Sequence, residues 1–175
     1  MDVIVSNGSY EYNLKKRFVR LIITDQNGYL WLVNSGGKLR FPSYAVNDND
    51  DLLDKAVTCF YNFFSFYNRM EFYGTFSYYN LLCKKDEFGK KYSKNDLSVN
   101  ECYIVEIDDC NPSYYKKHEN FLVKETYENF MKKILSSKDY SYREEMLTIV
   151  RFLPEDIKNK AYKESEKIKK IGSVK

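Results

Sequence analysis

A cluster of carboxylates is the part of the sequence whose residue types and spacing are best suited to chemistry. The cluster consists of Asp48, Asp50, Asp51 and Asp54. On a helix, Asp50 or Asp51 would share a face with Asp54, because residues three and four positions apart are neighbours there. Carboxylate oxygens are the ligands that Mg²⁺ and Mn²⁺ prefer, and a metal held by them can stabilise developing negative charge and orient a water. The cluster is therefore a candidate metal site, to which Glu101 or Glu106 could add a ligand.

The same acids also have a simpler structural interpretation. The apolar residues that follow them recur at spacings of three and four, which predicts a helix that begins near Asp48 and buries one face. That face would carry Leu53, Ala56, Phe60, Phe63 and Tyr67. Asn47, Asp48 or Asn49 could cap the first turn, and acids there suit the positive end of the helix dipole. We prefer this interpretation, in which the acids are capping and solvated groups, to a metal site.

The remaining elements place this helix beside a sheet. "RFVRLIITD" from Arg17 to Asp25 predicts a β-strand, and the Asn-Gly turn at Gln26 to Gly28 predicts a tight hairpin onto "YLWLVN". A short strand around Leu39 is stopped by Pro42 and followed by a loop. Further strands are predicted over 71–82 and 101–108, and further helices over 122–135, 141–153 and 154–170. This alternation predicts an α/β (α+β) fold, with a mixed sheet flanked by helices.

Two segments carry a resemblance to a known family. "RLIITDQNGYLWLVN" resembles the first hairpin of the Nudix hydrolase family, and "LRFPSYAVNDNDDLLDKAVTCFYNFFS" occupies the place of its strand-loop-helix signature. The resemblance covers roughly residues 15 to 135. It implies a Nudix-like mixed sheet sandwiched between helices, with an extra helical segment at the C-terminus. It also implies substrates of the nucleoside diphosphate-X type, which such enzymes cleave as pyrophosphohydrolases with Mg²⁺ or Mn²⁺.

The resemblance also shows which residues depart from the family's signature, whose helix carries three clustered glutamates as metal ligands. Phe41 and Pro42 match the residues that precede its paired glycines, which places Ser43 and Tyr44 at the glycine positions. One alignment places Asp50 at the first acid of the signature, Thr58-Cys59 at its Arg-Glu pair and Asn62-Phe63 at its final Glu-Glu pair. Shifting the alignment by one residue places Asp51, Cys59-Phe60 and Phe63-Phe64 at the same three positions. Neither register restores a clustered glutamate. The resemblance therefore implies a degenerate signature without the ordinary metal mechanism.

These observations lead to a division of the chain and to a functional hypothesis. We expect an N-terminal extension (1–14), a Nudix-like domain (15–153) and a Lys-rich C-terminal helix (154–175). The leading hypothesis is a catalytically degenerate Nudix-like protein that uses no metal cofactor and binds a nucleotide-like small molecule or a protein partner. From their placement, the candidate stacking surfaces are Tyr44, Trp31, Tyr78 and Tyr79.

Two alternatives remain open. One is a Nudix-type hydrolase of nucleoside diphosphate derivatives that requires Mg²⁺ or Mn²⁺ on displaced ligands. Its candidate ligands are Asp50, Asp51, Asp54 and Glu106. The other is a structural or interaction subunit of a larger assembly, for example a viral one.

The composition of the chain limits the classes of partner and the cellular compartments that we expect for the protein. Lysine outnumbers arginine by 22 to 6 and there are 17 Tyr, which indicates an A/T-rich genome. From Pro154 onward there are seven Lys and four acids, so the body of the chain is neutral, which argues against sequence-independent nucleic-acid binding. The four cysteines form no close pair, which is typical of reduced thiols in a cytoplasm, the host's if the protein is viral. No apolar stretch reaches the roughly 18 residues of a transmembrane helix.

Overall fold

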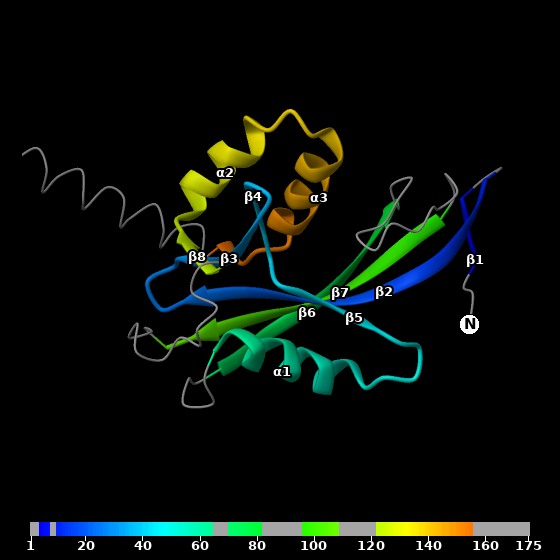
Figure 1. Ribbon diagram of the computed structural model, residues 1–175, viewed down its shortest axis with the longest axis horizontal. Coiled ribbons are helices and arrows are strands. Elements are labelled where there is room, and N and C mark those ends of the chain that lie inside the picture. Colours follow the sequence, from blue (N-terminus) through cyan, green and yellow to red (C-terminus); the bar gives the residue numbers. More distant parts are fainter. Residues whose placement is uncertain (1–3, 8–9, 65–69, 82–95, 109–121, 156–175) are drawn as a thin grey trace, which may run out of the picture.

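The computed structural model describes residues 4–7, 10–64, 70–81, 96–108 and 122–155, with side chains from residue 13 onward (Figure 1). In chain order the elements are β1 (Ile4–Asn7), β2 (Tyr10–Asp25), β3 (Leu30–Ser35), β4 (Lys38–Arg40), β5 (Ser43–Val46), α1 (Leu52–Phe63), β6 (Met70–Leu81), β7 (Asp96–Ile107), β8 (Leu122–Glu125), α2 (Tyr127–Leu135) and α3 (Tyr140–Arg151). No helix among these described residues is long and apolar enough to span a membrane.

The long strand β2 is the centre of the sheet. The main path runs β4-β3-β2-β7-β6, while β1 and β5 also pair with β2, and β8 pairs with β3. β2 and β7 are parallel and the other pairs are antiparallel, so the sheet is mixed, as the sequence predicts. The predicted hairpin is confirmed by the pairing of Ile23 with Trp31, and Gly28 in its turn has a φ of 85°, which favours glycine.

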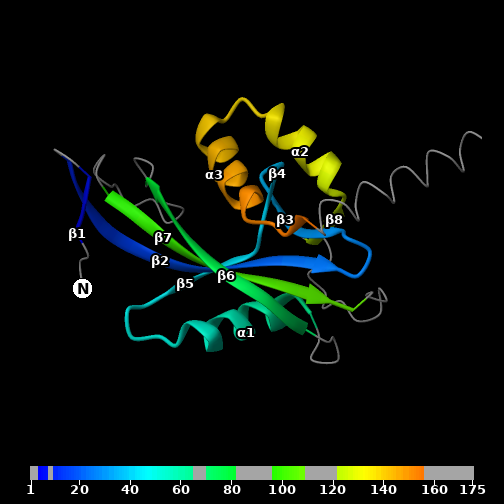
Figure 2. The same cartoon turned by 180° about the vertical axis from the view of Figure 1, so that it is seen from behind.

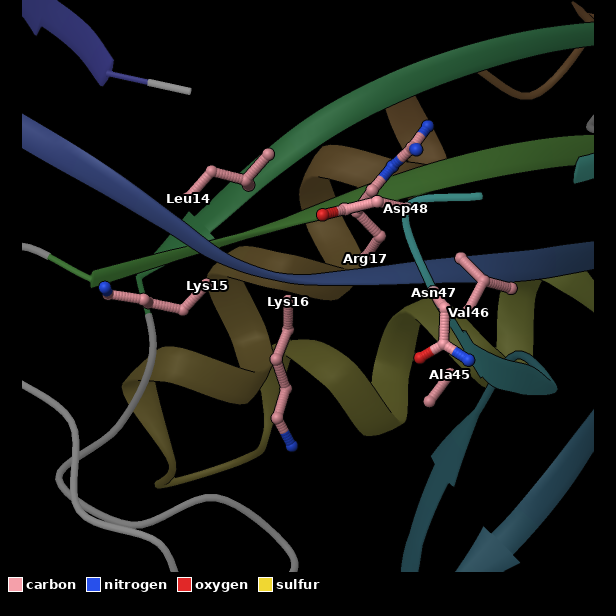
Figure 3. Close-up of a pocket in the computed structure, with 8 residues that line it drawn as sticks. All are labelled: Leu14, Lys15, Lys16, Arg17, Ala45, Val46, Asn47 and Asp48. Atoms are coloured by element: carbon pink, nitrogen blue, oxygen red, sulfur yellow. The ribbon is translucent and has the colours of Figure 1, made fainter. Parts of the chain in front are cut away.

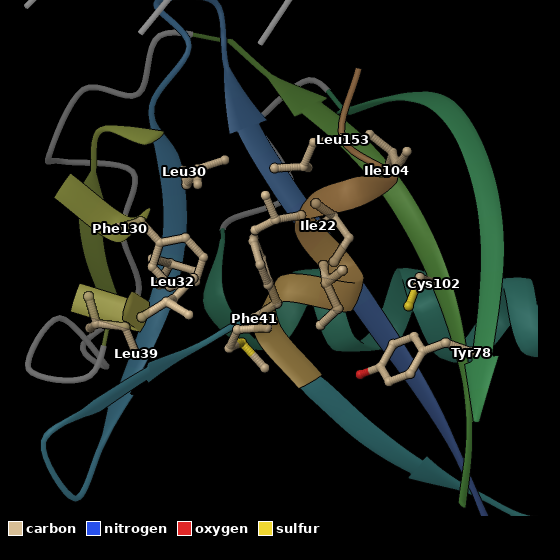
Figure 4. Close-up of a cluster of buried hydrophobic side chains, with 14 of the residues drawn as sticks. Ile22, Leu30, Leu32, Leu39, Phe41, Tyr78, Cys102, Ile104, Phe130 and Leu153 are labelled. Atoms are coloured by element: carbon tan, nitrogen blue, oxygen red, sulfur yellow. The ribbon is translucent and has the colours of Figure 1, made fainter. Parts of the chain in front are cut away.

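Helices cover both faces of the sheet. Figures 1 and 2 show α2 and α3 on one face, here called the α3 face, and α1 on the other, here called the α1 face. Successive side chains of β2 alternate between the two faces, so Ile22 packs into the core under α3 (Figure 4), whereas Leu21 and Ile23 pack under α1. The predicted α+β sandwich is therefore confirmed.

Helix α1 buries a slightly different stripe from the predicted one. Its fully buried residues are Ala56, Cys59 and Phe60, and Phe63 is partly buried beside them. Leu53, predicted to be buried, is 51% exposed, because the helix begins at Leu52 and Leu52 takes the inward position. The expected continuation of this face to Tyr67 lies outside the described residues.

Three segments differ from the sequence-based expectations. Ser43–Val46, expected in a loop, forms β5 because it pairs with β2. Leu122–Glu125, expected in a helix, forms β8 on β3, and α2 begins only after the N-cap Thr126. β2 begins at Tyr10, within the expected N-terminal extension. The Lys-rich helix expected over 154–175 lies almost entirely outside the described residues.

Candidate functional site

Two of the acids before α1 act as a cap and a turn group. Asp51 is the N-cap, and its Oδ1 accepts a hydrogen bond of 2.9 Å from the Asp54 backbone N–H. Asp50 Oδ2 accepts one of 2.8 Å from the Asn47 N–H. The cap therefore lies at Asp51 and not at the expected Asn47, Asp48 or Asn49, because the helix begins later than predicted.

The two strand glutamates lie on opposite faces of the sheet. Glu101 pairs in register with Val19 on the α1 face, whereas Glu106 pairs with Thr24 on the α3 face. Glu101 forms an ion pair with Arg17 at 3.9 Å and accepts a hydrogen bond from the Ser77 hydroxyl. Within the described ranges, no three His, Cys, Asp or Glu side chains are placed to hold one metal ion. The structure thus does not bring together the candidate ligands Asp50, Asp51, Asp54 and Glu106.

The helix positions that the resemblance assigns to metal ligands belong largely to the core. Cys59 and Phe60 are buried in the cluster under α1, and Phe64 stacks on Phe60 with ring centroids 4.8 Å apart. Burial raises the pKa of the Cys59 thiol to about 12. Asn62 is exposed. This face of α1 is therefore built to pack on the sheet, and its one assigned thiol stays protonated near neutral pH.

A first prediction concerns the reactivity of two cysteines. Cys59 and Cys102 are buried, and burial raises the pKa of each thiol to about 12. Because the thiolate is the reactive form, we expect both to resist iodoacetamide in the native protein at pH 8 and to react fully in denaturant. Peptide mass spectrometry resolves each site. Rapid native labelling of Cys59 would show that the space beneath α1 is open.

The four candidate stacking residues divide into two exposed and two buried side chains. Tyr44 on β5 and Tyr79 on β6 are 39% and 54% exposed, and their register places both on the α1 face. Trp31 and Tyr78 are only 5% and 6% exposed. Burial leaves neither of these two rings a face on which a base could stack.

The packing of Trp31 explains its burial. Its Nε1–H donates a 3.1 Å hydrogen bond to Asp25 Oδ2, and its ring meets Phe64 edge to face at 6.1 Å. Burial raises the pKa of the Asp25 carboxyl, although hydrogen bonds from Tyr29, Trp31 and Asn27 act in the opposite direction. Trp31 is thus a core residue that also satisfies a buried acid.

A pocket of about 310 Å³ lies at the edge of β2, next to β5 (Figure 3). Its lining residues are Leu14, Lys15, Lys16, Arg17, Ala45, Val46, Asn47 and Asp48. Three of them are cations and one is an anion, so the lining carries a net positive charge. Figure 3 shows that the side chains of Lys16 and Arg17 leave β2 in different directions.

The pocket exists because the pairing along this edge of β2 is interrupted. β1 pairs with residues up to Asn13, and β5 pairs from Arg17 onward. Among the described strands, none pairs with this edge over the intervening residues 14–16. The parallel register with β7 is also irregular here, between Leu14 and Lys16. No pattern in the sequence indicates this gap in the strand pairing, since the segment that forms β5 is expected to be a loop.

A buried polar network on the α3 face was also missed from the sequence. The Arg20 Nη1 donates a 2.8 Å hydrogen bond to the Phe41 carbonyl, and Arg20 Nη2 lies 3.7 Å from Glu145 Oε1 on α3. Arg40 approaches the same Glu145 oxygen at 3.5 Å, and Asn80 donates a hydrogen bond to the other. The network therefore ties α3 to three strands.

Tyr78 completes the surroundings of this network. Its hydroxyl is buried without a hydrogen-bond partner of ordinary geometry among the described residues, and Figure 4 shows it pointing into the cluster. Burial raises the pKa of Tyr78, and Coulombic attraction from Arg20 only partly offsets this. Tyr78 is therefore a neutral neighbour of the ion pair.

Comparisons with known proteins give a likeness at the level of structure. No known family profile matches the sequence, and no curated protein matches it. A MutT mutator protein from Bacillus halodurans is 15% identical, with a TM-score of 0.42, over 67% of this chain and 72% of that one. An Ap4A hydrolase from C. elegans is 12% identical, with a TM-score of 0.44, over 78% of this chain and 93% of that one.

Proposed function

We propose that this is a Nudix-like protein whose signature helix no longer holds a metal, and that it binds an anionic, nucleotide-type ligand without cleaving it. The observation that carries the proposal is the burial of Cys59 and Phe60 where the signature would present carboxylates. A hard divalent cation needs oxygen ligands, and neither side chain offers one. Nearby, Asp51 caps the first turn of the helix and Asp50 accepts a hydrogen bond from the backbone of the preceding turn.

The pocket at the β2 edge is the site that we propose for the anionic part of the ligand. Lys15, Lys16 and Arg17 line it, and Asn47 adds an amide. Cationic side chains form strong, charge-assisted hydrogen bonds with phosphate oxygens. Its volume of about 310 Å³ is at the lower end of the range for small-molecule pockets.

Tyr44 is the proposed stacking surface for a base. It lies on β5 next to Ala45, which lines the pocket, and its ring is partly exposed. Residues two apart on a strand are about 7 Å apart and share a face, so Tyr44 lies beside Val46 of the pocket. Tyr79, on β6, is a second candidate on the same face of the sheet.

A thermal-shift screen tests this proposal. Nucleoside diphosphates and nucleoside diphosphate sugars, each with and without Mg²⁺ or Mn²⁺, are expected to raise the melting temperature equally well without metal. The variant Lys15→Ala/Lys16→Ala is expected to weaken binding about tenfold or more, since it removes two charged contacts. Tyr44→Ala should weaken it by the roughly 1–3 kcal/mol of one stacked base.

Lys132→Ala/Lys138→Ala is the matched control, because it removes two exposed positive charges on the α2 side of the molecule. It should leave the affinity within about twofold of the parent, since exposed charges contribute little. Metal-dependent stabilisation together with release of phosphate would instead support the alternative hypothesis of a Nudix-type hydrolase with displaced metal ligands. Absence of any binding would leave the protein partner as the better hypothesis.

A further inference from the structure

Strand β6 forms one end of the sheet and is long for an edge strand. It runs for 12 residues and, among the described strands, pairs only with β7. Proteins usually protect such edges with lysines, prolines or short strands, because an open edge can pair with another chain. β6 contains no Lys, Arg or Pro, and Glu71 is its single charged residue. The opposite end of the path, β4, has three residues, two of them Lys38 and Arg40.

Large aromatic and aliphatic side chains are exposed along β6. Four of them are between 43% and 58% exposed: Phe72, Tyr73, Tyr79 and Leu81. An exposed aromatic strand with an open edge has the properties of a surface that adds a further strand.

The sequence of β6 is complementary to itself about Phe76. In an antiparallel pair with a second copy centred there, Thr75 would lie opposite Ser77. The irregularity between Phe72 and Gly74 shifts the register by one residue beyond that point, which brings Phe72 opposite Tyr79 of the second copy. Both residues lie on the α1 face, so the two rings would meet on the same side. Aromatic cross-strand pairs of this kind are stabilising.

The charges fit the same arrangement. In this register Glu71 faces Asn80 of the second copy, so no like charges are opposed. We propose that the protein forms a two-fold symmetric dimer in which the β6 strands of two copies pair antiparallel and join their sheets. The occupant of the edge is thus a second copy of this chain, because the self-pairing brings Phe72 opposite Tyr79 and opposes no like charges.

Sedimentation velocity on the full chain, over a range of concentrations, tests the dimer and its register. Phe72→Lys/Tyr79→Lys places like charges opposite each other at two symmetric positions and is expected to weaken the dimer at least about tenfold. Phe72→Glu/Tyr79→Lys changes the same positions but opposes unlike charges, and is expected to retain the dimer.

Both variants alter exposed residues, so each is expected to remain folded, and circular dichroism checks this. A parent protein that stays monomeric at high concentration overturns the proposal. If both variants lose the dimer equally, the pairing of Phe72 with Tyr79 is wrong, and the proposed dimer is overturned. Anion binding by Lys15, Lys16 and Arg17 at the pocket does not depend on either outcome, whereas stacking of a ligand on Tyr79 would compete with the dimer.

Discussion

Replacing Cys59 with Glu is expected to destabilise the protein by about 4 kcal/mol at neutral pH. The substitution places a carboxylate where, in one register, the resemblance assigns a glutamate, and this position lies in the core under α1. Burial raises the pKa of a carboxyl, typically by about 3 units at such a site, and each unit corresponds to about 1.36 kcal/mol. The raised pKa of Cys59 itself shows that this site disfavours a negative charge.

The loss should depend on pH with a definite sign. The folded-state pKa of the new carboxyl is raised above its unfolded value of about 4.3, so the variant is least destabilised below that pH. Its deficit grows as the pH rises from there to the folded-state pKa. Urea denaturation at several pH values measures this. Asn62→Glu is the control, because Asn62 is exposed and should tolerate the charge. A Cys59→Glu protein with parental stability would show that the helix face is not a packed core.

Removing the Glu145 carboxylate is the second change with a large expected effect. Glu145→Ala leaves the buried Arg20 guanidinium without its ion-pair partner and removes the hydrogen bond from Asn80. Breaking a buried pair in this way costs about 3–5 kcal/mol. Burial by itself lowers the pKa of Arg20, and Coulombic attraction to Glu145 is among the interactions that outweigh that effect. Without Glu145 the protein must therefore bury a charge with less compensation.

Chemical denaturation measures the loss of stability, and two further variants show which interactions cause it. Glu144→Ala changes the neighbouring acid of α3, for which no side-chain ion pair is found in the described region, and should cost less than about 1 kcal/mol. Arg20→Met/Glu145→Met replaces both charges with apolar groups and should recover part of the loss. Equal effects of Glu145→Ala and Glu144→Ala would contradict a structural role for the network.

The sequence predicted those elements that a short stretch of residues specifies by itself. The Asn-Gly turn determined the β2–β3 hairpin, and the three-and-four spacing determined α1, apart from the position of its first turn. The strands β5 and β8 were missed because their strand structure comes from pairing with β2 and β3, which no local pattern encodes.

The candidate site shows the same limit. That the acids cap the first turn could be expected from their position before the apolar face, and Asp51 does so. Arg20 resembled an ordinary charged residue in a strand, because its partner Glu145 lies far along the chain on α3. The pocket required two strands to stop short of each other on one edge of β2.

The central position of β2 has a consequence for the order of folding. Its parallel partner β7 begins only at Asp96, so a chain leaving the ribosome exposes one long edge of β2 until that strand has been made. Pairing over such a sequence separation slows folding, and the waiting strand is open to intermolecular pairing. The strand that organises the finished sheet is therefore also the segment with the longest exposed edge while the chain is being synthesised.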